Sequence, residues 1–545
     1  MRRLFLSVLT VLVDATYAAS PHVMTWSSQA YGPDGPWQAV MVEVGSNKQP
    51  VALYPGATYT STILTDSICT NKTVSSICYA TQAGTYNQTE STSAYPLSRS
   101  SWETLYWAVE GKGIEGGLGD QISFGPTVPN VSIQAVYQTY QTYPNGKAYP
   151  VQVGNLALGA PWSTATLANV TLNIITAWLY NSGGDNAIPS YSYGMHIGSV
   201  NPPIPGSLVL GGYDQSRVLG DISAQSVSLN TSTSGALQIS LKDIGLGVIG
   251  NATSPGFTSK DGLFQQSSGA QAAKMVTIDP TKPYMYLPEA TCNAITASLP
   301  VSFNQSLGLY IWDTTSRDYA NLTTSATYLS FVFNLNSINN QNVTVKVPLA
   351  QLALTLQAPL VDQNQTYFPC FLSTDTPVLG RAFLQSAFVG VNYHEGANTG
   401  TWFLAQAPGP SLGDATITPI SVTSKSISGV NASWEESWDE YFHLNTADPR
   451  SSSIASGGLS SEAKIGIGVG VGVGGAVVVA ALALWMVMRQ RKRQALAAQE
   501  QKAGVGGFVE LPARMADGPP RELEIQKHLE ARELVGSGPP RYELE

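Results

Sequence analysis

The residue types that most often carry out chemistry are few and scattered in this chain. Its five histidines show no His-Glu-x-x-His spacing, and its four cysteines include no Cys-x-x-Cys pair. Zinc-hydrolase and zinc-ribbon chemistry therefore drop out, and we expect neither a metal site nor a cofactor. The formal charge of −9 also excludes the basic surface that nucleic-acid binding requires. Structural disulfides become the leading interpretation of the cysteines.

Composition and the N-terminus indicate a secreted or surface protein. Only 12% of the 545 residues are charged, while 51 glycines, 33 prolines and 25 tyrosines are typical of a β-rich, loop-rich extracellular chain. Arg2 and Arg3 precede an apolar run at residues 4–13, and alanines follow at 15, 18 and 19. This pattern predicts a signal peptide over residues 1–19. The alternative is a buried first strand or helix.

A second apolar segment lies near the other end. Residues 465–488 carry no charge, and as a helix they would span about 36 Å, enough to cross a bilayer core. Basic residues follow at 489, 491, 492 and 493, which predicts a single-pass protein of the plasma membrane with a cytosolic C-terminus. Gly466, Gly470 and Gly474 have the Gly-x-x-x-Gly spacing, which suggests a homodimer through this helix. The alternative is a Gly-rich span without a partner.

Glycosylation signals agree with that topology. Every Asn-x-Ser/Thr sequence precedes the membrane segment, which is the arrangement expected for an extracellular portion made in the secretory pathway. The eleven acceptors are Asn71, Asn87, Asn130, Asn169, Asn230, Asn251, Asn304, Asn321, Asn342, Asn364 and Asn431.

The composition divides the rest of the chain into three parts. Residues 20–408 show alternating apolar patterns between Gly, Pro and Asn turns, which predicts a folded ectodomain. Residues 409–464 are rich in Ser and Thr and are interpreted as a stalk. The acidic aromatic patch at 434–442 within it is interpreted as a solvated linker, and the alternative is that it docks on the folded part or on a partner. The tail, residues 489–545, is predicted to be disordered.

The ectodomain is predicted to consist of strands. Residues 40–44 alternate, a turn follows at 45–48, and residues 51–54 return, which predicts a hairpin. Dense strand patterns over nearly 390 residues, with two cysteine pairs, favour two β lobes. We place the N-lobe at about residues 35–218 and the C-lobe at about 219–408.

Several segments, taken in order, resemble the pepsin-like aspartic peptidases, and more closely the membrane-tethered fungal members. They are residues 44–49, 206–214, 278–281 with 287–288, 378–384 and 389–393. The resemblance implies an all-β bilobal fold over about residues 35–408. With the order of the cysteines, it also implies the bridges Cys69–Cys78 and Cys292–Cys370, one in each lobe. Free cysteines are the alternative.

Aspartic proteolysis needs two facing carboxylates that share one proton, one from an Asp-Thr/Ser-Gly loop of each lobe. Counting without gaps from the hairpin places the first loop at Gly56, Ala57 and Thr58. The same count leaves Cys69 thirteen residues beyond Gly56, which is the family's spacing. The first aspartate position is therefore a glycine, which has no carboxylate.

The second loop keeps an aspartate, Asp279, but has Pro280 and Thr281 where Thr/Ser and Gly are expected. Pro280 has neither an N–H nor the hydroxyl that bridges the loops in the family. Residues 111–116 resemble the Gly-rich flap tip, and Glu110 stands where the family has a tyrosine. Three parts of the mechanism are altered together.

Asp66, followed by Ser67, imitates a catalytic loop, but it lies only three residues before Cys69. We interpret it as part of a surface turn and Asp279 as a loop aspartate kept for structure. The resulting hypothesis is an inactive cell-surface protein that binds peptide or wall polymer between its lobes. The alternatives are a membrane-anchored endopeptidase with non-standard loops and a purely structural wall tether.

Overall fold

The computed structural model describes residues 19–443 apart from 71–77, 107–108, 168, 230–234, 250–258, 267–272 and 337–340. Within these residues, no helix is long and apolar enough to span a bilayer. Residues 1–18 of the predicted signal peptide, the predicted membrane segment and the predicted disordered tail lie outside the described residues.

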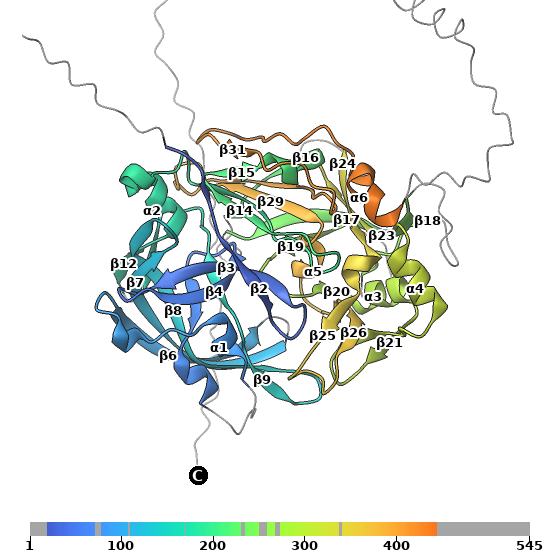
Figure 1. Cartoon of the computed structure of the whole chain (residues 1–545), viewed down its shortest axis with the longest axis horizontal. Helices are drawn as coiled ribbons and strands as arrows, with labels where there is room; N and C mark the ends of the chain where they lie inside the picture. The colour runs from blue at the N-terminus through green and yellow to red at the C-terminus, as the bar shows by residue number, and fades with distance from the viewer. Residues whose placement is uncertain are drawn as a thin grey trace, which may run out of the picture. The chain divides into compact units, whose positions relative to one another are not determined.

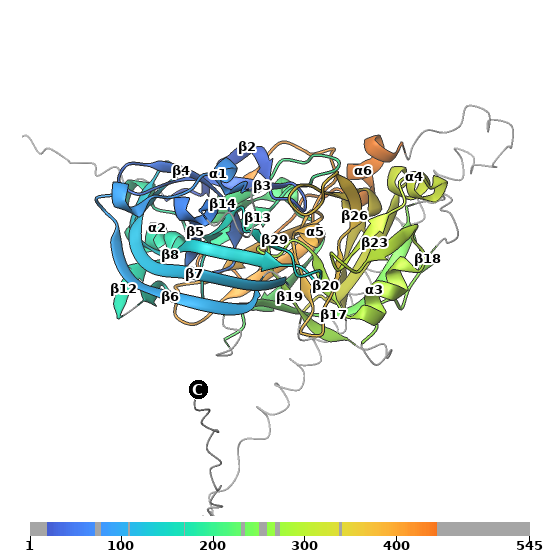
Figure 2. The ribbon, with the colours of Figure 1, turned by 90° about the horizontal axis from the view of Figure 1, so that it is seen from below.

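The N-terminal lobe is built on one large sheet, in which long curved strands run side by side (Figures 1 and 2). Its main path has the order β11-β12-β8-β5-β10-β4-β3-β7-β6, with β2 added to β3 and β9 to β8. The strands are β2 (Trp26–Tyr31), β3 (Trp37–Val44), β4 (Gln49–Gly56), β5 (Ser61–Leu64), β6 (Tyr95–Tyr106), β7 (Val109–Ser123), β8 (Thr127–Thr142), β9 (Ala148–Pro150), β10 (Gly154–Ala157), β11 (Thr164–Leu167) and β12 (Val170–Asn173).

The C-terminal lobe carries an eight-stranded and a four-stranded sheet. The first contains β17 (Leu237–Val248), β18 (Ser259–Lys260), β19 (Lys274–Ile278), β20 (Met285–Leu287), β23 (Thr327–Asn334), β24 (Asn342–Pro348), β27 (Cys370–Leu372) and β28 (Val378–Leu379). The second contains β21 (Val301–Asn304), β22 (Leu309–Trp312), β25 (Leu354–Leu356) and β26 (Gln365–Phe368).

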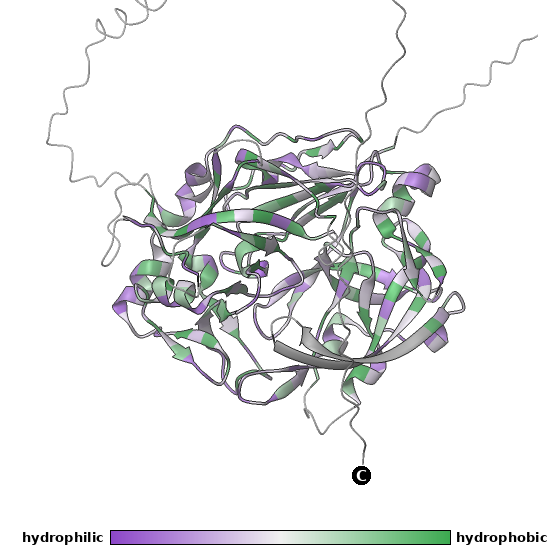
Figure 3. Ribbon diagram, turned by 180° about the vertical axis from the view of Figure 1, so that it is seen from behind, coloured by the Kyte–Doolittle hydropathy of each residue, from purple (hydrophilic) through white to green (hydrophobic). Residues whose placement is uncertain are grey.

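A six-stranded sheet joins the two lobes. Its order is β1-β14-β13-β29-β30-β16, and Met195 of β13 pairs with Val389 of β29, nearly two hundred residues later. Its strands are β1 (His22–Val23), β13 (Ser192–His196), β14 (Ser207–Leu210), β16 (Leu219–Ser226), β29 (Ala387–Asn392) and β30 (Thr401–Gln406). One apolar core is continuous through both lobes, and Figure 3 shows apolar residues along the strands. The sheet therefore fixes the lobes by backbone pairing, independently of any site between them.

Helices are short and lie mainly at the periphery (Figure 1). The α-helices are α1 (Ala80–Ala83), α2 (Ile175–Ser182), α3 (Glu289–Thr296), α4 (Arg317–Thr324), α5 (Arg381–Leu384) and α6 (Trp434–Phe442). The 3₁₀ turns are η1 (Asp66–Cys69), η2 (Gln88–Glu90), η3 (Gly184–Asn186), η4 (Gln215–Arg217) and η5 (Leu349–Leu352).

The expected bilobal β fold is confirmed, and so are both disulfides. Cys69 is bonded to Cys78 in the N-lobe, and Cys292 to Cys370 in the C-lobe. The predicted hairpin is also present, because β3 and β4 are paired from Val40 opposite Leu53 to Val44 opposite Gln49.

The predicted stalk does not begin at residue 409. The strand β31 (Ile417–Pro419) pairs with β15 (Gly212–Asp214), so this part of the chain belongs to the folded unit. The helix α6 then packs Trp434 and Trp438, both buried, against Leu219 and Ile249 of the C-terminal half. The interpretation of residues 434–442 as a solvated linker is therefore wrong. Burying two indoles outweighs the polar composition around them.

Candidate functional site

The first predicted loop leaves the end of a buried strand. β10 runs parallel to β4, with Gly56 opposite Ala157, and the Leu158 N–H donates to the Gly56 carbonyl at 3.0 Å. The Gly159 N–H donates to the Thr58 carbonyl at 3.0 Å. Two backbone hydrogen bonds thus hold this loop in place, although its first two residues offer no polar side chain.

The second loop is held in the same way. β28 runs parallel to β19, with Ile278 opposite Leu379, and the Asp279 N–H donates to the Leu379 carbonyl at 3.1 Å. Asp279 accepts two further bonds at Oδ1, from the Thr281 N–H at 2.9 Å and from the Thr281 hydroxyl at 2.7 Å. One carboxylate oxygen of the retained aspartate is therefore occupied within its own loop.

The two loops meet at Gly56 and Thr281. A Cβ atom placed on Gly56 would lie 2.9 Å from the Thr281 methyl group, closer than ordinary contacts allow. The backbone of Gly56 does not have a positive φ, so its requirement for glycine is one of space alone. The bulkier residue on the second loop fills the space that the smaller residue on the first loop leaves.

Two cations, Lys282 and Arg381, lie at the second loop. Burial lowers the pKa of the Lys282 amine, and the Asp279 carboxylate partly offsets this shift. Arg381, only 5% exposed, donates from Nη1 to the carbonyls of Pro280 at 3.1 Å and Thr281 at 3.0 Å. The guanidinium of Arg381 thus holds the second loop through two of its main-chain carbonyls.

A second buried carboxyl, Asp34, lies between the lobes and was not predicted. Its Oδ1 accepts from the Trp37 indole at 2.9 Å, and its main-chain carbonyl accepts from the Tyr367 hydroxyl of the C-lobe. Burial raises the pKa of Asp34, and the Arg381 charge opposes that shift. Hydrogen bonds with the Trp37 and Tyr284 side chains also act to lower this pKa. The carboxyl groups of Asp34 and Asp279 accept hydrogen bonds from different partners, Trp37 and Thr281.

Two small cavities lie beside the loops among the residues that the structure describes. One cavity of about 40 Å³ is lined by Asp34, Tyr54, Thr281 and Arg381. Another, of about 10 Å³, is lined by Pro55, Pro280 and again Arg381. Such volumes hold a few water molecules, whereas sites for organic ligands are usually of about 300–1,000 Å³.

The remaining predicted site residues lie elsewhere. Glu110 is in β7, paired with Leu105 of β6 and Thr142 of β8. Residues 111–116 are in the middle of paired strands, so the prediction that they form the flap tip is wrong. The β6–β7 hairpin reverses between Tyr106 and Val109. Asp66 is exposed on η1 and lines a separate surface pocket.

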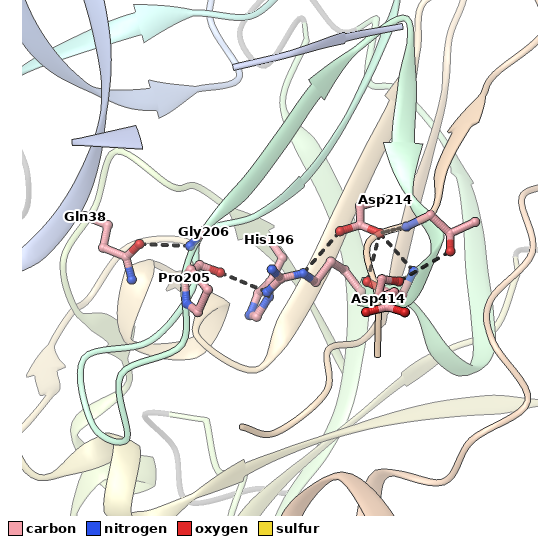
Figure 4. A network of polar contacts seen from close by, with 9 residues as sticks. Gln38, His196, Pro205, Gly206, Asp214 and Asp414 are labelled. Atoms are coloured by element: carbon pink, nitrogen blue, oxygen red, sulfur yellow. Dashed lines mark hydrogen bonds and ion pairs between the residues drawn. The ribbon is translucent and has the colours of Figure 1, made fainter. Parts of the chain in front are cut away.

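A second cluster of charged residues lies in and beside the sheet that joins the lobes (Figure 4). Arg217 donates to the Pro205 carbonyl at 2.8 Å, pairs with Asp214 at 3.4 Å and lies 3.5 Å from His196 Nδ1. Asp214 also accepts from the Thr416 N–H at 2.9 Å. Burial and the Arg217 charge lower the pKa of His196 to about 3. This cluster is structural, because its polar groups are engaged with one another.

A sequence model of the eukaryotic aspartyl proteases matches residues 39–399, which is more than half of the chain. The chain therefore belongs to the eukaryotic aspartyl protease family, and its mostly-β bilobal architecture is pepsin-like. No curated protein matches the sequence.

Proposed function

We propose that this protein is a non-catalytic member of its family, displayed on the cell surface, whose interlobe cleft binds peptide or wall polymer. The observation that carries the proposal is the contact between Gly56 and Thr281. It puts a buried glycine and a methyl group where the two loops face each other. A water activated by two carboxylates has no place in this arrangement.

The retained loop supports the same conclusion. Asp279 is engaged by the main chain and hydroxyl of Thr281. Removing one member of a catalytic set that acts as a unit typically costs several orders of magnitude in rate. We expect that Asp34 does not replace the missing group, because its carboxyl is buried and accepts a hydrogen bond from the Trp37 indole.

Ligand binding in the cleft requires movement. The cavities at the loops are too small for an extended chain in the state described here. The larger of them has hydrogen-bonding groups from both lobes, including Gln141, Gln152 and Tyr149 on the N-lobe side. Groups of this kind suit a peptide or a sugar polymer, which present many donors and acceptors. A ligand would bind once the hairpin β6–β7 has moved away from the loops, because the six-stranded sheet holds the lobes together.

The deciding experiment is an assay of the purified ectodomain on a broad peptide library at about pH 3–5, the range in which a carboxylate pair shares one proton. We expect no turnover above that of Asp279→Asn, which is the matched control. Turnover that Asp279→Asn and a transition-state-mimicking aspartic peptidase inhibitor both abolish would establish the alternative, an endopeptidase with non-standard loops. Turnover indifferent to Asp279 would indicate a contaminating protease.

The surface location rests on the sequence patterns at both ends and on the acceptor asparagines. Eight of the eleven acceptors lie in described residues and none of these is buried, whereas Asn71, Asn230 and Asn251 lie outside them. We propose a glycosylated extracellular portion, a single membrane span and a cytosolic tail. A C-terminal tag should be protected from external protease on intact cells, and a tag digested there would contradict this topology. Association of two copies through residues 465–488 remains part of the proposal.

A further inference from the structure

Arg381 lies at the junction of the lobes, on a scaffold that leaves it little freedom. It follows β28 directly, and its own N–H donates to the Lys282 carbonyl at 2.7 Å. A Cβ on the preceding Gly380 would collide with that carbonyl. Only glycine therefore lets the chain at the start of α5 lie this close to the second loop. The position of Arg381 is therefore set by the backbone of the C-lobe.

Its side chain, however, reaches the N-lobe. The guanidinium carbon lies 4.1 Å from the ring centre of Tyr54 and 5.3 Å from that of Trp37. Tyr54 is on β4, two residues before Gly56, and Trp37 begins β3. A guanidinium stacked on an aromatic ring away from water is attracted by the ring's negative face. One side chain thus touches the strand that carries the first loop and the carbonyls of the second.

Other groups around Arg381 also connect the two lobes. The Asp34 carboxyl, on the β2–β3 connection, feels the Arg381 charge, and the Tyr367 hydroxyl ties the Asp34 carbonyl to β26. The Gln357 N–H of the C-lobe donates to the Pro33 carbonyl at 2.8 Å. Arg381 also lines both small cavities between the lobes.

We propose that Arg381 is a positioning residue that clamps the two loops together across the lobe junction. In a member with two facing carboxylates, polar side chains of the loops can join the lobes there. Here Gly56 and Ala57 have none, and the guanidinium supplies the connection through its stack on Tyr54 and its bonds to Pro280 and Thr281. The inference concerns the mechanics of the junction, and it stands whether or not the cleft binds a ligand.

The test is native-state hydrogen exchange resolved to segments. The reporters are the N–H groups of Leu158 and Gly159, which donate to the first loop, and of Thr281 and Lys282 in the second. We expect Arg381→Met to speed exchange at least tenfold in both segments, beyond any change elsewhere in the domain. Arg381→Lys should give an intermediate increase, because one ammonium cannot both hold two carbonyls and stack on a ring.

Two sets of variants separate a clamp from a general loss of stability. Arg217→Met removes another buried arginine, which touches neither loop, and should leave the relative exchange of both segments unchanged. Tyr54→Leu should reproduce the effect of Arg381→Met, whereas Tyr54→Phe should not, and combining Tyr54→Leu with Arg381→Met should add little. If Arg381→Met does not fold, the Tyr54 pair still decides the question. Faster exchange in only the second loop, or a uniform change, would overturn the proposal.

Discussion

The two loops at the lobe junction have matching backbones and opposite side chains. Each follows a strand that is supported by a parallel neighbour, β4 by β10 and β19 by β28. The first loop has lost its functional groups, while the second keeps Asp279 and has gained Thr281, whose methyl group occupies the space beside Gly56. The difference teaches that strand pairing and the packing around the loops can maintain this architecture without the catalytic side chains, so the chemistry of the loops can be lost without losing the fold.

The strongest way to break this comparison is to return a carboxylate to the first loop. Gly56→Asp should lower the free energy of unfolding by about 3 kcal/mol or more, because it overpacks the contact with Thr281 and buries a charge. It should not restore turnover, since Pro280 and Thr281 remain. Denaturant unfolding measures the loss.

Two partner variants identify its cause. Gly56→Ala adds only the methyl group. The difference in unfolding free energy between Gly56→Ala and Gly56→Asp therefore gives the effect of the carboxylate. Thr281→Gly in the Gly56→Asp background should recover much of the stability, a coupling that additive sites would not show. Equal losses with and without Thr281→Gly would mean that the loops do not share this space.

The stability of the domain at low pH also bears on this comparison, because the peptidase assay is run at low pH. The folded pKa of His196 is about 3, below its unfolded value near 6.5, so the unfolded chain binds the extra proton between these values. The contribution of His196 to stability is present above pH 6.5 and falls by about 1.4 kcal/mol for each pH unit below it.

His196→Gln should reduce the dependence of the unfolding free energy on pH by about 1.4 kcal/mol per pH unit, the amount that corresponds to one proton. Unfolding measured from pH 7 to pH 4 would detect this change. An unchanged slope would place the acid sensitivity elsewhere. The measurement also shows whether the domain is folded during the assay, so that inactivity of the loops is not confused with acid unfolding of the sheet.

The smallest expected effect concerns Asp279 itself. Asp279→Asn keeps an oxygen that can accept from the Thr281 N–H and hydroxyl. It should therefore change the free energy of unfolding by less than about 1 kcal/mol. Thr281→Val, which keeps the shape and removes the hydroxyl, should cost about 1 kcal/mol, and less in the Asp279→Asn background. A large loss for Asp279→Asn would show that the charge is needed to balance Lys282 and Arg381.

Local sequence patterns predicted what depends on local geometry. The β3–β4 hairpin has a fixed register, so counting along it located Gly56 at the end of β4. The order of the cysteines and the family resemblance gave both disulfides. The prediction of the flap tip was wrong because a run of glycines was interpreted as a turn. Residues 111–116 instead lie in β7, which pairs with β6 on one side and β8 on the other.

The lobe junction could not be predicted in this way. Asp34 and Arg381 are more than three hundred residues apart, and only the closing of the two lobes brings the guanidinium charge close enough to shift the carboxyl. Helix α6, by contrast, had a usable signal. Ser433 and Glu436 form a capping box, and Trp434, Trp438 and Tyr441 recur at helical spacing. The Ser/Thr-rich surroundings favoured the linker interpretation over the alternative that this patch docks on the domain.

The docked segment that ends in α6 has a mechanical consequence. The chain beyond residue 443 leaves the domain from this helix, which is held by two indoles and by a contact between Lys346 and Glu435. Tension applied from the C-terminal side would peel α6 first and then β31, the outer strand of a two-stranded pairing. Because α6 packs on Leu219 of β16, and Asn392 of β29 donates to the carbonyls of residues 421, 422 and 424, the six-stranded sheet carries this load from the start. The docked segment thus connects a pulled C-terminal chain directly to the sheet that joins the two lobes.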